Sequence, residues 1–244
     1  MLTTLKQTLH RNWALLLFEL VIVVIGVSVS FAIQDLRDGR AEVRTEQRLL
    51  TNFAQDLTED KVLLEAFIEQ LDTRIELLAS AFHPEERAGL EPKQLDQVMD
   101  CMLSYVGFSA SQSAWLELQQ GGNMSLVRDK ALVRRIINHY GRVLPQVEEW
   151  DGINRSFVLD RMFPFVDEHG PAFPLNTEQA YAEGYHLAFK SLEGDPAFVK
   201  LARTSRLFLQ GQRAAFQAQL DNTQRLLEFL PEATPPVVTR PGKQ

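Results

Sequence analysis

The stretch that decides the fold is WALLLFELVIVVIGVSVSFAI, residues Trp13–Ile33. Its only ionisable side chain is that of Glu19. An α-helix rises about 1.5 Å per residue, so about 20 apolar residues cross the hydrocarbon layer of a bilayer. Trp13 stands where an interfacial aromatic residue is expected. The pattern predicts a transmembrane helix over 13–33 after a short tail over 1–12, and makes the lipid bilayer the first expected partner.

A cleaved signal peptide is the competing interpretation of this stretch. Ser30-Phe31-Ala32 has the small-x-small form of a cleavage site. The apolar run is longer than the roughly 7–15 residues of a signal-peptide core, and it carries a carboxylate. Both features favour a retained membrane anchor.

Glu19, Gly26 and Ser30 share one face of the predicted helix, because they are spaced by seven and four residues. Gly26 and Ser30 form a small-xxx-small pair, which lets two membrane helices approach closely. A charged group within a span usually faces protein or water. One hypothesis is an association face that serves a homo-oligomer or a membrane protein partner. The alternative is that Glu19 reaches the interface and the small residues have no special role.

Charges at the two ends of the span bear on its orientation. Lys6 and Arg11 precede it, and four arginines interleaved with acids follow it: Arg37, Arg40, Arg44 and Arg48. Counting basic residues alone places the C-terminal part in the cytoplasm, but long domains obey that rule poorly. We favour the bacterial inner (cytoplasmic) membrane, with the C-terminal domain on the periplasmic side.

From Gln34 to Phe82 the chain has no proline and one glycine. Apolar residues recur there at intervals of three, four or seven: Leu50, Phe53, Leu57, Leu64, Phe67, Leu71, Ile75, Leu78 and Phe82. This is the stripe of a long amphipathic helix in near-heptad register, interrupted by Asp60. We therefore expect a coiled-coil-like stalk helix over 34–82, continuous with the span and ended by His83-Pro84.

Caps and apolar periodicity predict further helices between residues 83 and 230. They cover Lys93–Tyr105, a short segment at Trp115–Leu118 ended by Gly121-Gly122, Leu126–Val143, Pro145–Arg161, Glu178–Leu192, and a last helix from Pro196 to Leu230. Asp195-Pro196 is a strong helix start, and Phe163–Leu175, with three prolines, predicts a loop. The Leu126–Val143 helix is expected to bury Ile137 with its other apolar residues.

The expected fold class is all-α, since no strand alternation and no internal repeat is present. The N-terminal transmembrane helix runs into the stalk helix, and an antiparallel helical bundle over 83–230 is completed by the stalk. The last residues, PEATPPVVTRPGKQ (231–244), have no core-forming pattern. They predict a proline-rich disordered tail.

Two stretches resemble a bacterial family of single-span membrane proteins of unknown function. The first is FELVIVVIGVSVSFAIQDLRDGRAEVRTEQRLL (18–50), with an acid opening the span and a charged helix after it. The second is SAWLELQQGGNMSLVRDKALVRRIINHY (113–140), a helix–loop–helix ending in a tyrosine. Asp35-Leu36-Arg37 stands where family members often carry an Asn-rich, Trp-containing exit. The resemblance implies a membrane-bound helical protein and carries no activity.

Composition excludes several functions. The net charge of −7, from 25 Lys+Arg against 32 Asp+Glu, argues against a nucleic-acid partner. The single cysteine, Cys101, excludes an intramolecular disulfide and a cysteine zinc site, and it is expected in the core.

Glu183-x-x-His186 has the spacing of carboxylate di-iron bundles, but no second such motif occurs.

No catalytic, cofactor-binding or metal-binding set of residues is predicted, so we expect no enzyme and no cofactor. Gly121-Gly122 before a helix could hold an anion with Arg128, Arg134 and Arg135, although glycine pairs usually form plain turns. The first functional hypothesis is a membrane-anchored interaction, scaffold or accessory protein. The second is a ligand-sensing bundle that modulates a separate membrane complex, with a pocket near four aromatic residues: Trp115, Tyr140, Trp150 and Phe157.

Overall fold

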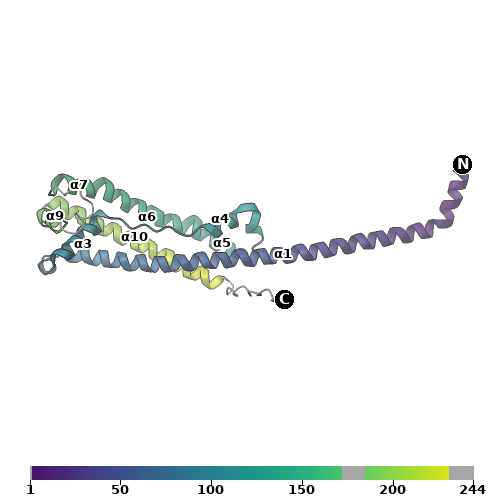
Figure 1. The fold of residues 1–244 in the computed structure, drawn as a ribbon, viewed down its shortest axis with the longest axis horizontal. Helices are drawn as coiled ribbons and strands as arrows, with labels where there is room; N and C mark the ends of the chain where they lie inside the picture. Colours follow the sequence, from purple (N-terminus) through teal and green to yellow (C-terminus); the bar gives the residue numbers. More distant parts are fainter. Residues whose placement is uncertain (1, 172–184, 231–244) are drawn as a thin grey trace, which may run out of the picture. The chain divides into compact units, whose positions relative to one another are not determined.

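The computed structural model describes residues 2–171 and 185–230, and within them the chain is all-α with no strand. This confirms the predicted fold class, a long N-terminal helix followed by a helical bundle (Figure 1). The elements are α1 (Leu2–Ala81), α2 (Pro84–Arg87), α3 (Pro92–Leu103), α4 (Ser113–Gln119), the 3-10 helix η1 (Gln120–Ser125), α5 (Lys130–Asn138), the π-helix η2 (His139–Val143), α6 (Leu144–Phe157), the π-helix η3 (Val158–Met162), α7 (Phe163–His169), α9 (Tyr185–Leu192) and α10 (Pro196–Phe229).

The chain divides into two compact units, Met1–Leu49 and Leu50–Gln244. In the described part of the first unit, α1 is the only element. Among the described residues, α1 is also the one helix long and apolar enough to cross a membrane, with a window of mean hydropathy 2.2 that is not buried. The second unit is the helical bundle.

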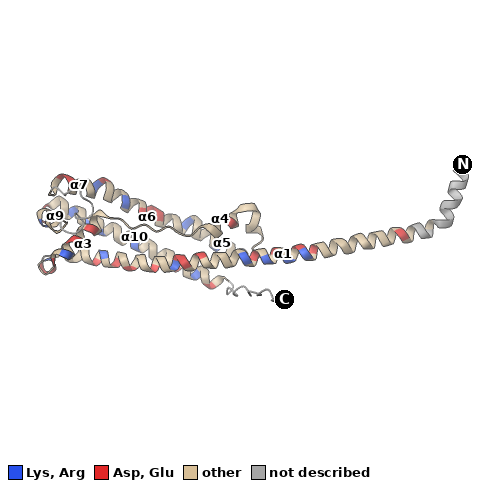
Figure 2. Cartoon of the chain, viewed as in Figure 1, with Lys and Arg blue, Asp and Glu red and all other residues tan. Residues whose placement is uncertain are grey.

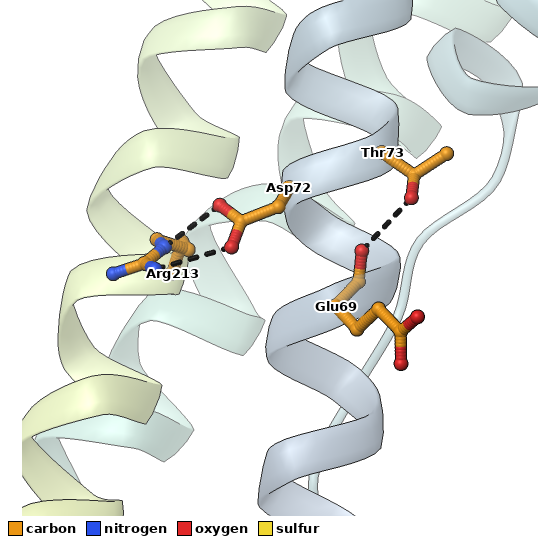
Figure 3. Close-up of polar contacts among 4 residues, drawn as sticks. All are labelled: Glu69, Asp72, Thr73 and Arg213. Atoms are coloured by element: carbon orange, nitrogen blue, oxygen red, sulfur yellow. Dashed lines mark hydrogen bonds and ion pairs between the residues drawn. The ribbon is translucent and has the colours of Figure 1, made fainter.

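Three long helical segments build the bundle: α1 from Leu50 onward, α10, and the run from α5 to α7. In Figure 1, α6 and α10 extend along this part of α1, with α3, α7 and α9 gathered at one end. Phe67 contacts Phe216 and Phe82 contacts Phe198, so α10 runs antiparallel to α1. An ion pair joins the same two helices, with Arg213 Nε 2.8 Å from Asp72 Oδ1 (Figure 3).

Leucines spaced by seven residues form the α1 side of the core. Leu57, Leu64 and Leu71 are completely buried, and Leu78 is 1% exposed. Phe198 and Phe216 of α10 are also completely buried. Burial of a leucine or phenylalanine side chain contributes about 1.5–3 kcal/mol, so this stripe explains why α1 packs with the bundle.

The run from Lys130 to His169 is helical throughout, although it contains two prolines. The Leu144 N–H donates to the His139 carbonyl, and the Phe163 N–H donates to the Val158 carbonyl, each five residues back. These π turns directly precede Pro145 and Pro164. Proline lacks an N–H and clashes with the carbonyl four residues earlier, and a wider turn accommodates it.

Several predicted boundaries are wrong at this run. The loop predicted to begin at Phe163 is helix α7 as far as His169. The π turn before Pro164 lets the helix continue past this proline. The expected break before Pro145 is a π turn within a helix. Ile137 is 44% exposed, so it is not buried with the other apolar residues of this segment as expected. The remainder of the predicted loop, the start of the 178–192 helix and the 231–244 tail lie outside the described residues.

Other helix ends follow the sequence signals. α1 ends two residues before His83-Pro84. The Asp195 carboxylate accepts the Ala197 N–H at 2.7 Å and caps α10. Gly121 and Gly122 have φ of 62° and 79°, a region that side chains with a Cβ disfavour. Their lack of a Cβ therefore permits the turn after α4.

Candidate functional site

The apolar stretch of α1 is the largest feature that the bundle does not bury. Every described side chain from Leu17 to Leu36 is exposed, including Phe31 at 62% and Leu36 at 65%. Figure 2 draws this stretch almost entirely without charge, and charged residues resume on its C-terminal side. Contiguous apolar surface of this extent marks a membrane or protein interaction site.

The predicted association face lies within this stretch. Glu19, Gly26 and Ser30 are all exposed, and an added Cβ at Gly26 would meet nothing within 4 Å. The Ser30 hydroxyl donates to the Gly26 carbonyl at 2.8 Å, so its polar group is satisfied by its own helix. The face is therefore open to a partner helix, and Ser30 needs no hydrogen bond from it.

The four aromatic residues predicted to line a pocket make separate contacts. Trp115 and Tyr140 stack with ring centroids 5.0 Å apart. The Trp150 ring lies against Gly211, where an added Cβ would overlap it. Phe157 packs on Phe208, 5.1 Å between centroids, beside a shallow hollow. The structure therefore brings Trp115 and Tyr140 together, while Trp150 and Phe157 pack on α10.

Buried polar side chains gather around residues 104–112, which form neither helix nor strand between α3 and α4. Asp60 Oδ1 accepts the Ser111 N–H at 2.8 Å, and Asp151 Oδ2 accepts the Phe108 N–H at 2.8 Å. The Gln212 amide donates to the Val106 carbonyl at 2.6 Å. Three different helices thus supply partners for backbone groups that regular structure leaves unpaired.

The same arrangement continues at both ends of this segment. Asp56 accepts bonds from the Ser113 hydroxyl and the Ala114 N–H, each at 2.9 Å. Arg74 Nη2 donates to the Ser104 hydroxyl at 3.0 Å. Asp60, which interrupts the apolar stripe in the sequence, thus has a structural role. Sequence reasoning noticed Asp60 but missed its partners, because they lie about 50 residues away in the chain.

Burial changes the protonation of this cluster. Removal from water raises the pKa of Asp60 to about 6, with neighbouring Asp56 adding to the effect. Asp60 Oδ2 has no hydrogen-bond partner among the described residues. Burial also raises the pKa of Asp151. One oxygen of each carboxylate accepts a backbone N–H, so both side chains hold the 104–112 segment in place.

His139, at the start of η2, is completely buried against α10. Its Nδ1 lies 2.7 Å from the Asn222 amide nitrogen, and its Nε2 lies 3.2 Å from that of Gln219. Burial lowers the pKa of His139 to about 4, so the ring is neutral at physiological pH. Its polar neighbours fix its orientation in the core.

A basic hollow of about 310 Å³ lies between α5 and α10. Its lining residues are Ala131, Arg134, Arg135, Asn138, Asn222, Arg225 and Leu226, with no carboxylate among them. Arg135 is positioned by the Phe229 ring, 3.8 Å from its guanidinium carbon. Three arginines thus border one hollow of an acidic protein, an arrangement that favours an anion over a cation.

The anion site considered at Gly121-Gly122 has a different arrangement. The following helix, α5, is capped by its own Asp129, which accepts the Ala131 and Leu132 N–H groups. A carboxylate of the chain therefore occupies the position that an anion would take. Of the arginines predicted near the glycines, Arg134 and Arg135 line the basic hollow instead.

The other side chains considered for chemistry are Cys101, His186 and Glu183. The Cys101 thiol is buried, and burial raises its pKa to about 11, so it is protonated at neutral pH. His186 Nδ1 lies 3.1 Å from Asp96, and Glu183 lies outside the described residues. Within 2–171 and 185–230, no group of three His, Cys, Asp or Glu side chains could hold a metal ion.

Comparisons of the chain with protein-family models, with curated proteins and with solved structures find no match.

Proposed function

We propose that this chain is a single-span bacterial membrane protein, akin to the family it resembles, that displays a helical bundle for binding other proteins. The observation that carries the proposal is the exposed apolar stretch of α1, where Phe18, Val23 and Phe31 are each at least 60% exposed. Water would disfavour this surface, whereas a bilayer would accept it. The bundle then acts as an interaction, scaffold or accessory domain.

The polar interior of the bundle favours binding over catalysis. Its buried acids accept backbone N–H groups, and its buried histidine is held by amides. Such committed groups stabilise one conformation and leave the outer surface to recognise a partner. The partner is a membrane protein or a second copy of the chain, and the bundle lies on the periplasmic side.

Membrane insertion is tested by fractionation of cells that produce the full chain. We expect the protein in the membrane fraction, resistant to carbonate extraction, at its full length. Val24→Lys places a charge near the centre of the span, which costs about 2.5–3.5 kcal/mol on insertion scales, and should move protein to the soluble fraction. Val24→Leu is the matched control. Cleavage after Ala32 would overturn the anchor in favour of a signal peptide.

Protease accessibility in spheroplasts and inverted vesicles tests orientation. A periplasmic bundle is digested in spheroplasts and protected in inverted vesicles, and the opposite result places it in the cytoplasm. Purification in mild detergent with crosslinking then tests the interaction role. A stoichiometric second protein that is lost in Val24→Lys and retained in Val24→Leu would support an accessory subunit.

A second candidate function is sensing of an anionic ligand, and the basic hollow favours it. Arg134, Arg135 and Arg225 can bind a phosphate-type group by charge-assisted hydrogen bonds, with Asn138 and Asn222 as further donors. Titration calorimetry with inorganic phosphate is the test. We expect Arg225→Gln to weaken binding by about tenfold. Arg206→Gln, an exposed arginine outside the hollow, should have no effect. Equal binding by both variants would remove the hollow from consideration.

A further inference from the structure

Charges on α1 between the apolar stretch and the bundle follow an unusual order. The acids are Asp35, Asp38, Glu42 and Glu46, and the bases are Arg37, Arg40, Arg44 and Arg48. Both series have spacings of three, four and four residues. Consequently every pair three or four residues apart is of like charge, and no opposite charges are neighbours on the helix surface.

At 100° per residue the acids lie on one side of the helix and the bases on the opposite side. Like charges four residues apart destabilise a single helix. The side chains from Asp35 to Arg44 that carry these charges are exposed, and they form no ion pair within the described part of the chain. The opposite charges that a neighbouring helix could offer to residues 35–44 are therefore not supplied by α1 itself.

An apolar seam runs between the two charged sides. It consists of Ile22, Ile25, Val29, Ala32, Leu36, Gly39 and Val43, spaced alternately by three and four residues. This is the pattern of the a and d positions in a coiled coil. Ala32 and Gly39 are small, which permits two helices to approach closely. Leu36 is 65% exposed, so the seam is open.

We propose that residues 22–43 of α1 pair in parallel with the same segment of a second copy, through this seam. The inference deepens the proposed function by naming the partner of the span and rests on it for the membrane-embedded half. Asp35 falls at position g and Arg40 at position e of the next heptad. In a parallel pair these positions face each other, so Asp35 of each copy meets Arg40 of the other. The acidic side of each helix then lies beside the basic side of the other, so the same contact forms on both sides of the seam.

Charge disfavours the Glu19, Gly26 and Ser30 face for such a symmetric pair. Arg37 and Arg44 follow Ser30 by seven and fourteen residues, and therefore continue that face. A parallel pair formed there would place arginines of the two copies opposite each other. That face suits a different protein with acidic residues next to its span, whereas the Ile22–Val43 seam suits a second copy.

Disulfide crosslinking in native membranes tests the seam. Single cysteines are placed in full-length Cys101→Ala protein at Leu36, on the seam, and at Ala41, on the opposite side of the helix. Disulfides need Cα atoms about 4.4–6.8 Å apart, a distance that seam positions of a parallel pair reach. We expect Leu36→Cys to give at least about fivefold more dimer than Ala41→Cys. Equal yields would overturn the proposal, as would greater crosslinking of Ser30→Cys than of Leu36→Cys.

A charge exchange tests the ion pair without altering the seam. Asp35→Arg alone and Arg40→Asp alone should each weaken dimerisation by about tenfold, because both symmetric pairs become repulsive. The double variant, D35R with R40D, should restore it. Failure of the double variant to restore dimerisation would contradict the Asp35–Arg40 contact.

Fractionation of the same samples separates this inference from the proposed function. Membrane-bound protein that does not crosslink at Leu36 contradicts the seam and leaves the anchor intact. Protein that crosslinks at Leu36 but is found in the soluble fraction contradicts the anchor and supports the pairing. Protein that is soluble and does not crosslink contradicts both.

Discussion

The two parts of α1 before and after Leu50 have the same apolar period and different surroundings. Leu57, Leu64 and Leu71 are completely buried in the bundle. Seven-residue steps in the other direction give Leu36, Val29 and Ile22, which are 65%, 52% and 53% exposed. An apolar period forms a helix in both parts, but the partners of the first part are not in the described chain. This difference in exposure is the observation behind the two proposals, a membrane anchor and a paired helix.

The largest contrast is expected between core and seam leucines. Leu64→Ala removes a completely buried side chain and should lower the free energy of unfolding by about 3–4 kcal/mol, whereas Leu36→Ala should change it by less than about 0.5 kcal/mol. Denaturant unfolding of the full chain in detergent, followed by circular dichroism, measures both. Similar losses would mean that the Leu36 side chain is also buried against protein in the folded state.

Next in size is the effect of removing an internal partner of the 104–112 segment. Gln212→Leu leaves the Val106 carbonyl and Oδ1 of Asp151 without the donor they share, and should cost about 3 kcal/mol. The control is Gln217→Leu, which breaks a partly exposed bond to Asp221 one turn away in the same helix. It should cost less than about 0.5 kcal/mol. Equal costs would show that the segment is not held by Gln212.

The free energy of unfolding should depend on pH because Asp60 is buried in the bundle. Because burial raises the pKa of Asp60 to about 6, the folded state binds more protons than the unfolded state between pH 4 and 6, and Asp60 lowers stability as pH rises. Asp60→Asn removes this loss. The stability of the variant relative to the parent should therefore increase by about 2–3 kcal/mol from pH 4 to pH 7.

His139 contributes the opposite slope in the same pH range. Its pKa is lowered to about 4, so its contribution is present above pH 6.5 and is lost as pH falls toward 4. This effect is common to parent and Asp60→Asn and cancels in their difference. Glu76→Gln, an exposed acid further along the same helix, is the control. Parallel profiles for all three proteins would contradict the role of Asp60.

A smaller effect on stability is expected at the contact between Gly211 of α10 and Trp150 of α6. Gly211→Ala introduces a Cβ that overlaps the Trp150 ring, and should destabilise the bundle by about 1–3 kcal/mol. Gly152→Ala, on α6 with open space around it, should stabilise by up to about 1 kcal/mol through helix propensity. Thermal unfolding of the pair decides, and a stabilising Gly211→Ala would contradict the close contact.

The smallest effect on stability is expected for the partly exposed ion pair between Asp72 and Arg213 (Figure 3). Hydrogen bonds from Arg213 lower the pKa of Asp72, but the two side chains are 45% and 36% exposed, so solvent screens the pair. Asp72→Asn should cost at most about 1 kcal/mol, and less in high salt. A larger, salt-independent cost would place this contact with the buried polar cluster.

Local signals in the sequence predicted much of the fold. Period and the absence of proline predicted one long helix over 13–82, and Asp195-Pro196 predicted the start of α10. Pro145 and Pro164 misled, because a proline usually marks a helix boundary. Here contacts between the Lys130–His169 run and α10 stabilise the helix at both prolines. The wider π turns accommodate the prolines, which cannot donate a backbone hydrogen bond.

By itself the sequence determined where most helices form and which stretch is apolar enough to cross a membrane, because both depend on residues a few positions apart. Tertiary structure decided the partners of the buried polar groups. Asp60 meets Ser111, Gln212 meets Val106 and Asp151, and Arg225 joins Arg134 and Arg135 around one hollow. These contacts span up to 106 residues and carry no local signature, so only the packing of α1, α5, α6 and α10 brings them together.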